Sequence, residues 1–291
     1  MDTIENGTAS GEGESASPGG GADATSGQTA DAVSGVGAAS SRTTSPGDVL
    51  GSSENSRWAV AVRGLSKSYG KRRALDRVSL EVGWGSVCGL VGPNGSGKST
   101  IIGSIVGLLR IDSGRALVDG AEYHWLRQPG RLVGTMRQSP AFTLRNTINQ
   151  HLEVMRRALG VTSQRVDDCL KEVGLEDRRR SRIGSLSGGL RQRLSLAGAI
   201  LGDPRILILD EPANGMDPES AALLRRLIRG LAGRGGAVLV STHQLAELSL
   251  WADSCYVINQ GRVKSRLDSA TVQDPEALFD AFLQATSGQG A

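Results

Sequence analysis

The stretch GPNGSGKST, Gly92–Thr100, determines how the rest of the chain is interpreted. It fits the pattern G-x-x-x-x-G-K-[ST] in full. A short apolar run, Ser86–Val91, comes before it, and Ser99–Leu109, where apolar residues recur at helical spacing, follows. A strand, a glycine-rich loop and a helix in this order are the context in which the pattern predicts a phosphate-binding loop, or P-loop.

The chemistry predicted for this loop is anion binding. Glycines let backbone N–H groups curl around a β-phosphate, and the helix that begins there adds the positive end of its dipole. We expect Lys98 to reach the β- and γ-phosphates, Ser99 to ligate Mg²⁺ and Thr100 to hydrogen-bond an adjacent phosphate oxygen. The earlier positions of the loop complete the predicted cradle: Gly92, Pro93, Asn94, Gly95, Ser96 and Gly97. The alternative, a glycine-rich turn with a surface lysine, does not explain the flanking strand and helix.

Residues 1–56 differ in composition from the rest of the chain. They are mostly Gly, Ser, Ala, Thr and acidic residues, which cannot bury enough surface to offset the entropy of ordering, so we expect a disordered tail. One arginine against eight acidic residues gives this tail a net charge of −7, and because the whole chain is +3, residues 57–291 carry +10. The arginines of this body are spread along the sequence, which favours a solvated surface over a nucleic-acid partner.

Neither a signal peptide nor a membrane span is visible in the sequence. The start lacks a basic and an apolar region, and no run reaches the roughly 18 apolar residues of a span. Cys88, Cys169 and Cys255 are far apart without a C-x-x-C pair, which is typical of reduced thiols in the cytoplasm. We therefore expect a soluble body that reaches a membrane only through a partner.

Buried strands alternate with helices from Trp58 onward, which predicts an α/β fold with a mostly parallel sheet. Trp58–Arg63 and Ala74–Val82 alternate apolar and polar residues, as half-buried antiparallel strands do, with a loop containing Tyr69 between them. Amphipathic segments at about 140–190 predict a helical subdomain. Further strands are expected within Arg115–Gly120, Leu132–Gln138, Arg205–Pro212 and Gly236–Gln244, and a hairpin around Asn259–Gly261 within Cys255–Val263. Further helices are expected within Ile183–Pro204, Pro218–Gly233, Leu245–Ala252 and Pro275–Gln284.

Two carboxylates, Asp210 and Glu211, end one buried strand, at the edge where ligands bind in open α/β sheets. We expect Asp210 to hold Mg²⁺, directly or through water, and Glu211 to orient and polarise an attacking water. An acidic pair that caps a loop is the alternative. His243 ends a strand expected beside that of Asp210, where it would contact the γ-phosphate, unless it is only a structural hydrogen-bonding group. Gln138 ends another strand and would complete the Mg²⁺ shell, an assignment that the sequence leaves open.

LSGG, Leu186–Gly189, is the second motif that points to phosphate. Ser187 stands where a helix N-cap belongs, and Gly188 and Gly189 allow close backbone approach, so hydroxyl, N–H groups and helix dipole would form a second phosphate site. The P-loop already holds the γ-phosphate of one nucleotide, so a second cradle makes sense if it closes over the nucleotide of another copy. A Gly-Gly linker before a helix is the competing interpretation.

Taken in order, the motifs between Trp58 and Arg266 resemble those of the ATP-binding cassette (ABC) ATPases. The matching segments are Walker A at Gly92–Thr100, the Q-loop at Gln138, the signature at Leu186–Leu190, Walker B at Ile206–Pro212, the D-loop at Ala213–Pro218 and the switch histidine at His243. The resemblance implies a P-loop NTPase with an N-terminal antiparallel β-subdomain and an inserted helical subdomain, within residues 57–291. It also implies that Tyr69 stacks on adenine and that the catalytic residues are Lys98, Gln138, Glu211 and His243.

ATP and Mg²⁺ are the cofactors that the resemblance implies. It further implies a head-to-tail dimer, with a second copy or a paralogous cassette, in which two ATPs lie between the P-loop of one subunit and the signature of the other. The helices at 140–190 would receive a coupling helix from separate transmembrane permease subunits, on the cytoplasmic face of the cell membrane. Three residues depart from the family's usual motifs: Leu190 stands where Gln is usual, Ala213 where Ser or Thr is usual, and Met216 where Leu is usual. These changes do not imply an inactive site.

The layout, with THQLAEL at Thr242–Leu248, resembles the drug, antibiotic or bacteriocin-export branch (ABC-2) of the family. We therefore expect an ATPase that powers export of a drug, antibiotic or peptide. The lantibiotic-immunity group often has Glu at the Q-loop, so Gln138 argues against that narrower assignment. The alternative is a non-transport soluble cassette, for example of the iron–sulfur assembly type, and a regulatory role of residues 1–56 is also open.

Overall fold

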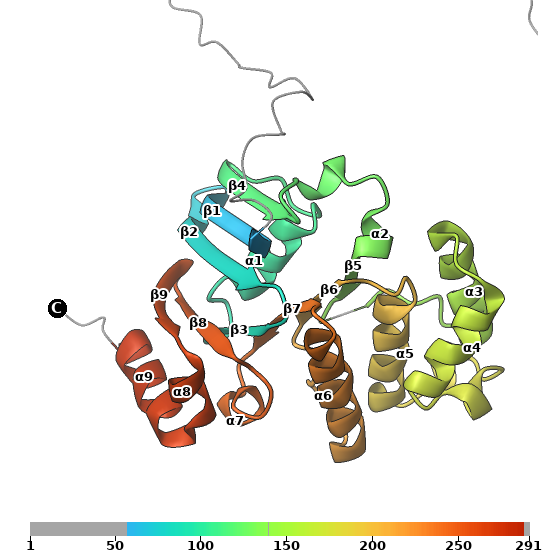
Figure 1. Ribbon diagram of the computed structural model, residues 1–291. Coiled ribbons are helices and arrows are strands. Elements are labelled where there is room, and N and C mark those ends of the chain that lie inside the picture. The colour runs from blue at the N-terminus through green and yellow to red at the C-terminus, as the bar shows by residue number, and fades with distance from the viewer. Residues whose placement is uncertain (1–56, 139, 288–291) are drawn as a thin grey trace, which may run out of the picture. The chain divides into compact units, whose positions relative to one another are not determined.

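The computed structural model describes residues 57–138 and 140–287, so the tail predicted to be disordered lies outside the described residues. The core is a six-stranded sheet with the order β5-β6-β7-β3-β8-β9 (Figure 1). Five strands run parallel, and β9 pairs antiparallel with β8. Their bounds are Val87–Val91 for β3, Val133–Met136 for β5, Ile206–Asp210 for β6, Ala237–Thr242 for β7, Ser254–Asn259 for β8 and Arg262–Leu267 for β9. This sheet confirms the mostly parallel α/β fold.

The central strands β3, β6 and β7 are buried at every residue, which explains their continuous apolar sequences. Alternate residues of β6 enter different cores: Leu207 and Leu209 pack with the helices of one face. Ile206 and Ile208 pack with α1 (Lys98–Ile105) and the smaller sheet on the other. With both faces covered, the carboxyl ends of the strands are the edge left for a ligand.

The smaller sheet is antiparallel, with the order β2-β1-β4, and corresponds to the predicted N-terminal β-subdomain. Its strands are β1 at Trp58–Tyr69, β2 at Arg72–Gly83 and β4 at Ser113–Val118. The loop predicted between the first two strands is wrong, because the hairpin continues to a two-residue turn at Gly70 and Lys71, with Gly70 at φ +58°. Several register shifts along the hairpin interrupt the alternation of apolar and polar residues, which hid its outer half.

Most predicted helices are present. Their bounds are Ile148–Leu159 for α3, Ser163–Glu172 for α4, Gly188–Ile200 for α5, Pro218–Gly233 for α6, Leu245–Leu248 for α7 and Pro275–Ser287 for α9. Side-chain caps start several of them: Thr162 caps α4, and Asp217 caps α6, which has Pro218 at its first position. Two short helices, α2 (Pro129–Leu132) and α8 (Ser269–Gln273), were not predicted.

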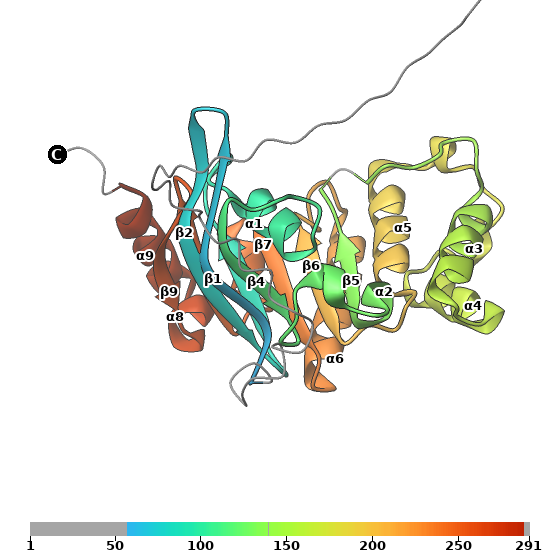
Figure 2. The same cartoon turned by 90° about the horizontal axis from the view of Figure 1, so that it is seen from above.

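Helices α3 and α4 pack against each other and against α5, beyond the β5 end of the large sheet (Figures 1 and 2). They fall inside the range predicted for the helical subdomain. Within the described residues, no helix combines the length and the apolar character that crossing a membrane would take.

Candidate functional site

The P-loop joins β3 to α1, as predicted. A Cβ on Gly92 would lie 2.1 Å from the carbonyl oxygen of Ile258, and a Cβ on Gly97 would lie 2.7 Å from Cδ2 of Leu75. Gly97 also has φ +111° where it caps α1. These two positions need glycine because β8 and β2 approach the loop closely.

The turn between β8 and β9 is hydrogen-bonded to the P-loop. The N–H of Gly261 donates to the carbonyl oxygen of Ser96 at 2.8 Å, and the N–H of Asp76 donates to the carbonyl oxygen of Gly261 at 2.8 Å. This turn therefore links the P-loop to β2 in the antiparallel sheet. The sequence indicated a hairpin here but not its contact with the loop.

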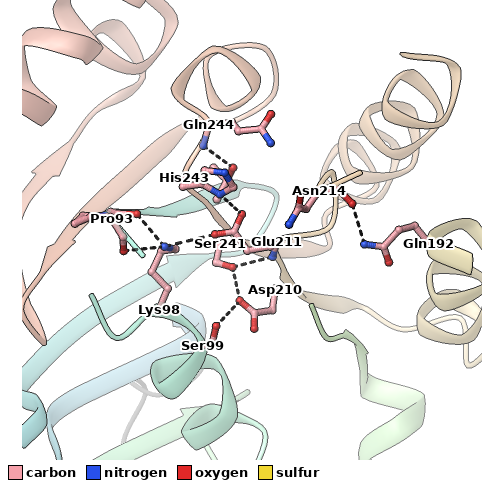
Figure 3. A network of polar contacts seen from close by, with 12 residues as sticks. Pro93, Lys98, Ser99, Gln192, Asp210, Glu211, Asn214, Ser241, His243 and Gln244 are labelled. Carbon is pink, nitrogen blue, oxygen red and sulfur yellow. Dashed lines mark hydrogen bonds and ion pairs between the residues drawn. The ribbon is translucent and has the colours of Figure 1, made fainter. Parts of the chain in front are cut away.

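The Lys98 ammonium lies inside the P-loop (Figure 3). Its Nζ donates to the carbonyl oxygens of Gly92 at 2.8 Å and Pro93 at 3.3 Å, and lies 3.5 Å from Oε1 of Glu211. Both charged side chains are only 6% exposed. A buried cation is stable here because two carbonyls and a carboxylate replace its water.

Glu211 and His243 meet because β6 and β7 are neighbours, as the sequence predicted. Nδ1 of His243 lies 2.7 Å from Oε2 of Glu211 (Figure 3), so the imidazole N–H donates to the carboxylate. Glu211 has φ +51°, a left-handed conformation that is uncommon for a non-glycine residue and occurs at functional sites. The carboxylate is thus held by His243 on one oxygen and approached by Lys98 at the other.

Asp210 accepts two hydroxyl hydrogen bonds on Oδ1. Ser241 Oγ donates at 2.6 Å, and Ser99 Oγ donates at 3.1 Å. Ser241 Oγ also accepts from the N–H of Glu211 at 2.9 Å. The sequence analysis missed Ser241, although a polar residue near the end of an apolar strand is a usable signal.

These residues border a cavity of about 660 Å³. Of the predicted site residues, it is lined by Tyr69, Asn94, Gly95, Gly97, Lys98, Ser99, Thr100, Gln138 and Glu211. Gly92, Pro93 and Ser96 lie in the same loop as the lining residues. Asp210 and His243 do not line the cavity themselves, but Asp210 is hydrogen-bonded to Ser99 and His243 to Glu211, which do. The lining residues that the sequence analysis missed are Arg72, Arg73, Ala74, Gln260 and Gly261. No sequence signal pointed to the last two, because their place depends on the packing of a distant hairpin.

Gln138 lines the cavity, but it does not end a strand as predicted. Strand β5 stops at Met136, and Gln138 is exposed in the bend that follows. It borders two hollows: the 660 Å³ cavity and a second groove of about 410 Å³ that Gly188 and Asn214 also line.

The signature residues do not line the 660 Å³ cavity. Ser187 caps α5 as predicted, its Oγ accepting from the N–H of Leu190 at 3.3 Å. A Cβ on Gly189 would lie 3.0 Å from Oδ2 of Asp217, whereas a Cβ on Gly188 would have no atom within 4 Å. Gly189 therefore serves the packing of α5 against the start of α6, and Gly188 has no such requirement within the described residues.

The donor set fits a nucleotide phosphate. Ser96 Oγ is buried without a hydrogen-bond partner among the described residues, beside a loop shaped by glycines. The Ser99 hydroxyl and the Asp210 carboxylate are the oxygen ligands that Mg²⁺ prefers. Within the described residues, no group of three or more His, Cys, Asp or Glu side chains is placed to hold a metal ion.

Comparison with known proteins decides the family. The ABC transporter family model matches residues 75–214. The lantibiotic transport ATP-binding protein SrtF of Streptococcus pyogenes is 33% identical over 221 residues, which are 76% of this chain and 96% of SrtF. This chain belongs to the ABC transporter ATP-binding proteins. The cassette is an ATPase, and the family resemblance seen in its motifs is confirmed.

Other relatives agree. The daunorubicin resistance ATP-binding protein DrrA3 of Streptomyces coeruleorubidus is 38% identical over 210 residues, which are 70% of this chain and 66% of DrrA3. The solved structure of an ATP-binding subunit of an ABC transporter is 27% identical to this chain with a TM-score of 0.70, and the match covers 78% of this chain and 99% of the solved one. The P-loop NTPase fold is thereby confirmed as well.

Proposed function

We propose that the cassette hydrolyses ATP to drive export through membrane-spanning subunits encoded as separate chains. The observation that carries the proposal is the Glu211–His243–Lys98 cluster against the P-loop cavity. Export is supported by the names of relatives, which include lantibiotic transport, Nod factor export and daunorubicin resistance proteins. The cargo would be a drug, antibiotic or peptide.

Glu211 is the proposed base or hydrogen-bond acceptor for the attacking water. His243 fixes one carboxylate oxygen at 2.7 Å, which leaves the orientation of the group defined before substrate binds. Lys98 would release its carbonyl partners to reach the β- and γ-phosphates, and His243, whose side chain is 39% exposed, would contact the γ-phosphate. Tyr69, 49% exposed at the rim, would stack on the base.

Mg²⁺ would be held by Ser99 and Asp210, with Gln138 completing the shell. The 3.1 Å hydrogen bond from Ser99 Oγ to Asp210 Oδ1 supports this set, because it brings two oxygen ligands of the kind that Mg²⁺ prefers close together. When bound, the ion neutralises charge on the β- and γ-phosphate oxygens.

A dimer would complete two nucleotide sites. Ser187, Gly188 and Gly189 form a helix N-terminus outside the P-loop cavity of their own chain, which suits a role toward the nucleotide of a second cassette. That second cassette would be another copy or a paralogue.

The membrane partner would contact the helical block formed by α3 and α4, within the predicted subdomain 140–190. In this arrangement residues 57–291 form the nucleotide-binding domain, at the cytoplasmic face of the cell membrane. No nucleic-acid partner is proposed.

The test is a pull-down from detergent-solubilised native membranes with the full chain carrying Glu211→Gln and with ATP present. The variant should retain a closed dimer, and a protein with several membrane spans should co-purify. The same variant without nucleotide is the control. Recovery of soluble proteins alone, with the cassette absent from the membrane fraction, would contradict the exporter assignment.

A further inference from the structure

Arg72 lines the proposed nucleotide cavity, although it belongs neither to the P-loop nor to the residues proposed for hydrolysis. It lines the 660 Å³ cavity, and its Nη2 lies 3.9 Å from the point where a Cβ on Gly95 would sit. Its guanidinium therefore stands over the glycine loop, on the side of the antiparallel sheet.

The pairing of β1 with β2 determines on which face of the hairpin the Arg72 side chain lies. Tyr69 and Arg72 are paired residues on either side of the turn, and side chains of paired residues in antiparallel strands lie on the same face. Tyr69 lines the same cavity. Lys71, between them in the turn, does not line it.

Arg72 also differs from its neighbour in its partners. Arg73 is committed to a carboxylate, its Nη1 lying 3.1 Å from Oδ1 of Asp76, which also pairs with Arg262. Arg72 forms no ion pair within the residues that the structure describes. A guanidinium without a counter-ion beside a phosphate loop is suited to bind phosphate oxygens, because its planar fork donates two parallel hydrogen bonds.

We propose that Arg72 is a nucleotide-binding residue that grips the α–β phosphate link from the side opposite Lys98. The inference rests on the proposed nucleotide site. In the proposed site Tyr69 would stack on the base and Lys98 would reach the β- and γ-phosphates. Arg72 is paired in register with Tyr69 and lies beside Gly95 of the P-loop, so its guanidinium would meet the phosphates that join these two ends. ATP and ADP share this link, so both depend on the arginine.

The experiment measures Kd by calorimetry on the full chain, for ADP and for a non-hydrolysable ATP analogue, each with Mg²⁺. Arg72→Gln should raise both Kd values about tenfold, the loss expected for a charge-assisted pair. Lys71→Gln removes the same charge one residue away and should leave both within about twofold. The dependence of Kd on salt should weaken in Arg72→Gln alone, which a purely structural effect would not produce.

Unchanged Kd values in Arg72→Gln would overturn the inference, and so would a rise confined to the ATP analogue, which would place the arginine at the γ-phosphate. If Arg72→Gln does not fold, Arg72→Lys carries the test: it keeps the charge without the fork, and a Kd equal to the wild type would overturn the inference. Failure of the wild type to bind either nucleotide would instead refute the proposed function. If Lys98→Ala loses nucleotide binding while Arg72→Gln binds like the wild type, only the role of Arg72 is refuted.

Discussion

Ser241 Oγ donates to Asp210 Oδ1 at 2.6 Å while it accepts from the N–H of Glu211 at 2.9 Å. A single hydroxyl on β7 thus fixes both acidic residues at the end of β6. Ser241 is fully buried, so no water can replace either bond. The proposed metal ligand and the proposed base are held in register through the neighbouring strand.

Replacing Ser241 with alanine should therefore slow hydrolysis. Ser241→Ala leaves the buried N–H of Glu211 and one oxygen of Asp210 with fewer partners, which costs about 1–3 kcal/mol of folding free energy. We expect kcat to fall about tenfold, measured together with the melting temperature. Ser249→Ala is the control and should match the wild type, because within the described residues the Ser249 hydroxyl bonds only to the carbonyl oxygen of Ala246.

The two signature glycines should respond differently to alanine. Gly188→Ala should melt like the wild type, because a Cβ there meets no atom within 4 Å. Gly189→Ala should melt lower, because its Cβ would lie 3.0 Å from Asp217. If Gly188 faces the nucleotide of a second cassette, Gly188→Ala should still lose at least about tenfold in hydrolysis rate. Full activity in that variant would argue against a second phosphate site.

The turn that supports the P-loop should matter for nucleotide binding. A Cβ in Gly261→Ala would lie 2.3 Å from the carbonyl oxygen of Ala74, at φ +72°. Gly235→Ala is a matched control, since it has a similar φ of +84° but no atom within 4 Å of the Cβ. Both should lose roughly 1–2 kcal/mol from left-handed strain, and only Gly261→Ala should weaken nucleotide binding. Equal affinities would contradict the coupling of this turn to the loop.

The cysteines should be unreactive in the folded protein. Burial raises the pKa of the thiols of Cys88, Cys169 and Cys255 to about 12. Since the thiolate is the reactive form, a raised pKa keeps each group a thiol throughout pH 7–9. A thiol reagent added to the native chain should show no reaction that rises with pH over this range, and three thiols should react after denaturation. Rapid labelling of the native chain at pH 8 would contradict their burial.

The placement of the residues at the strand ends was predictable because each of them carries a local signal in the sequence. Asp210 and Glu211 directly follow an apolar run, His243 directly follows the end of β7, and parallel strands end at the same edge of a sheet. The glycine loop was equally clear, since its flanks show a strand and a helix.

Other parts of the site depend on tertiary packing that no local pattern encodes. Gln260 and Gly261 reach the cavity because the β8–β9 turn packs against β2, nearly two hundred residues earlier in the chain. The outer half of the β1–β2 hairpin, and with it the position of Arg72, was hidden by register shifts in the pairing. The hydrogen bond from Ser241 to Asp210 likewise depends on β7 lying beside β6, which no local pattern at Ser241 indicates.

The most direct test of the proposed chemistry is the steady-state rate of phosphate release from MgATP by the purified wild type and by Glu211→Gln, with nucleotide retention measured on the same samples. The geometry around Glu211 predicts turnover in the wild type, its loss by at least about a hundredfold in Glu211→Gln, and retained ATP in the variant, because the amide cannot accept a proton. Hydrolysis near the wild-type rate in Glu211→Gln would contradict the assignment of Glu211 as the residue that activates water.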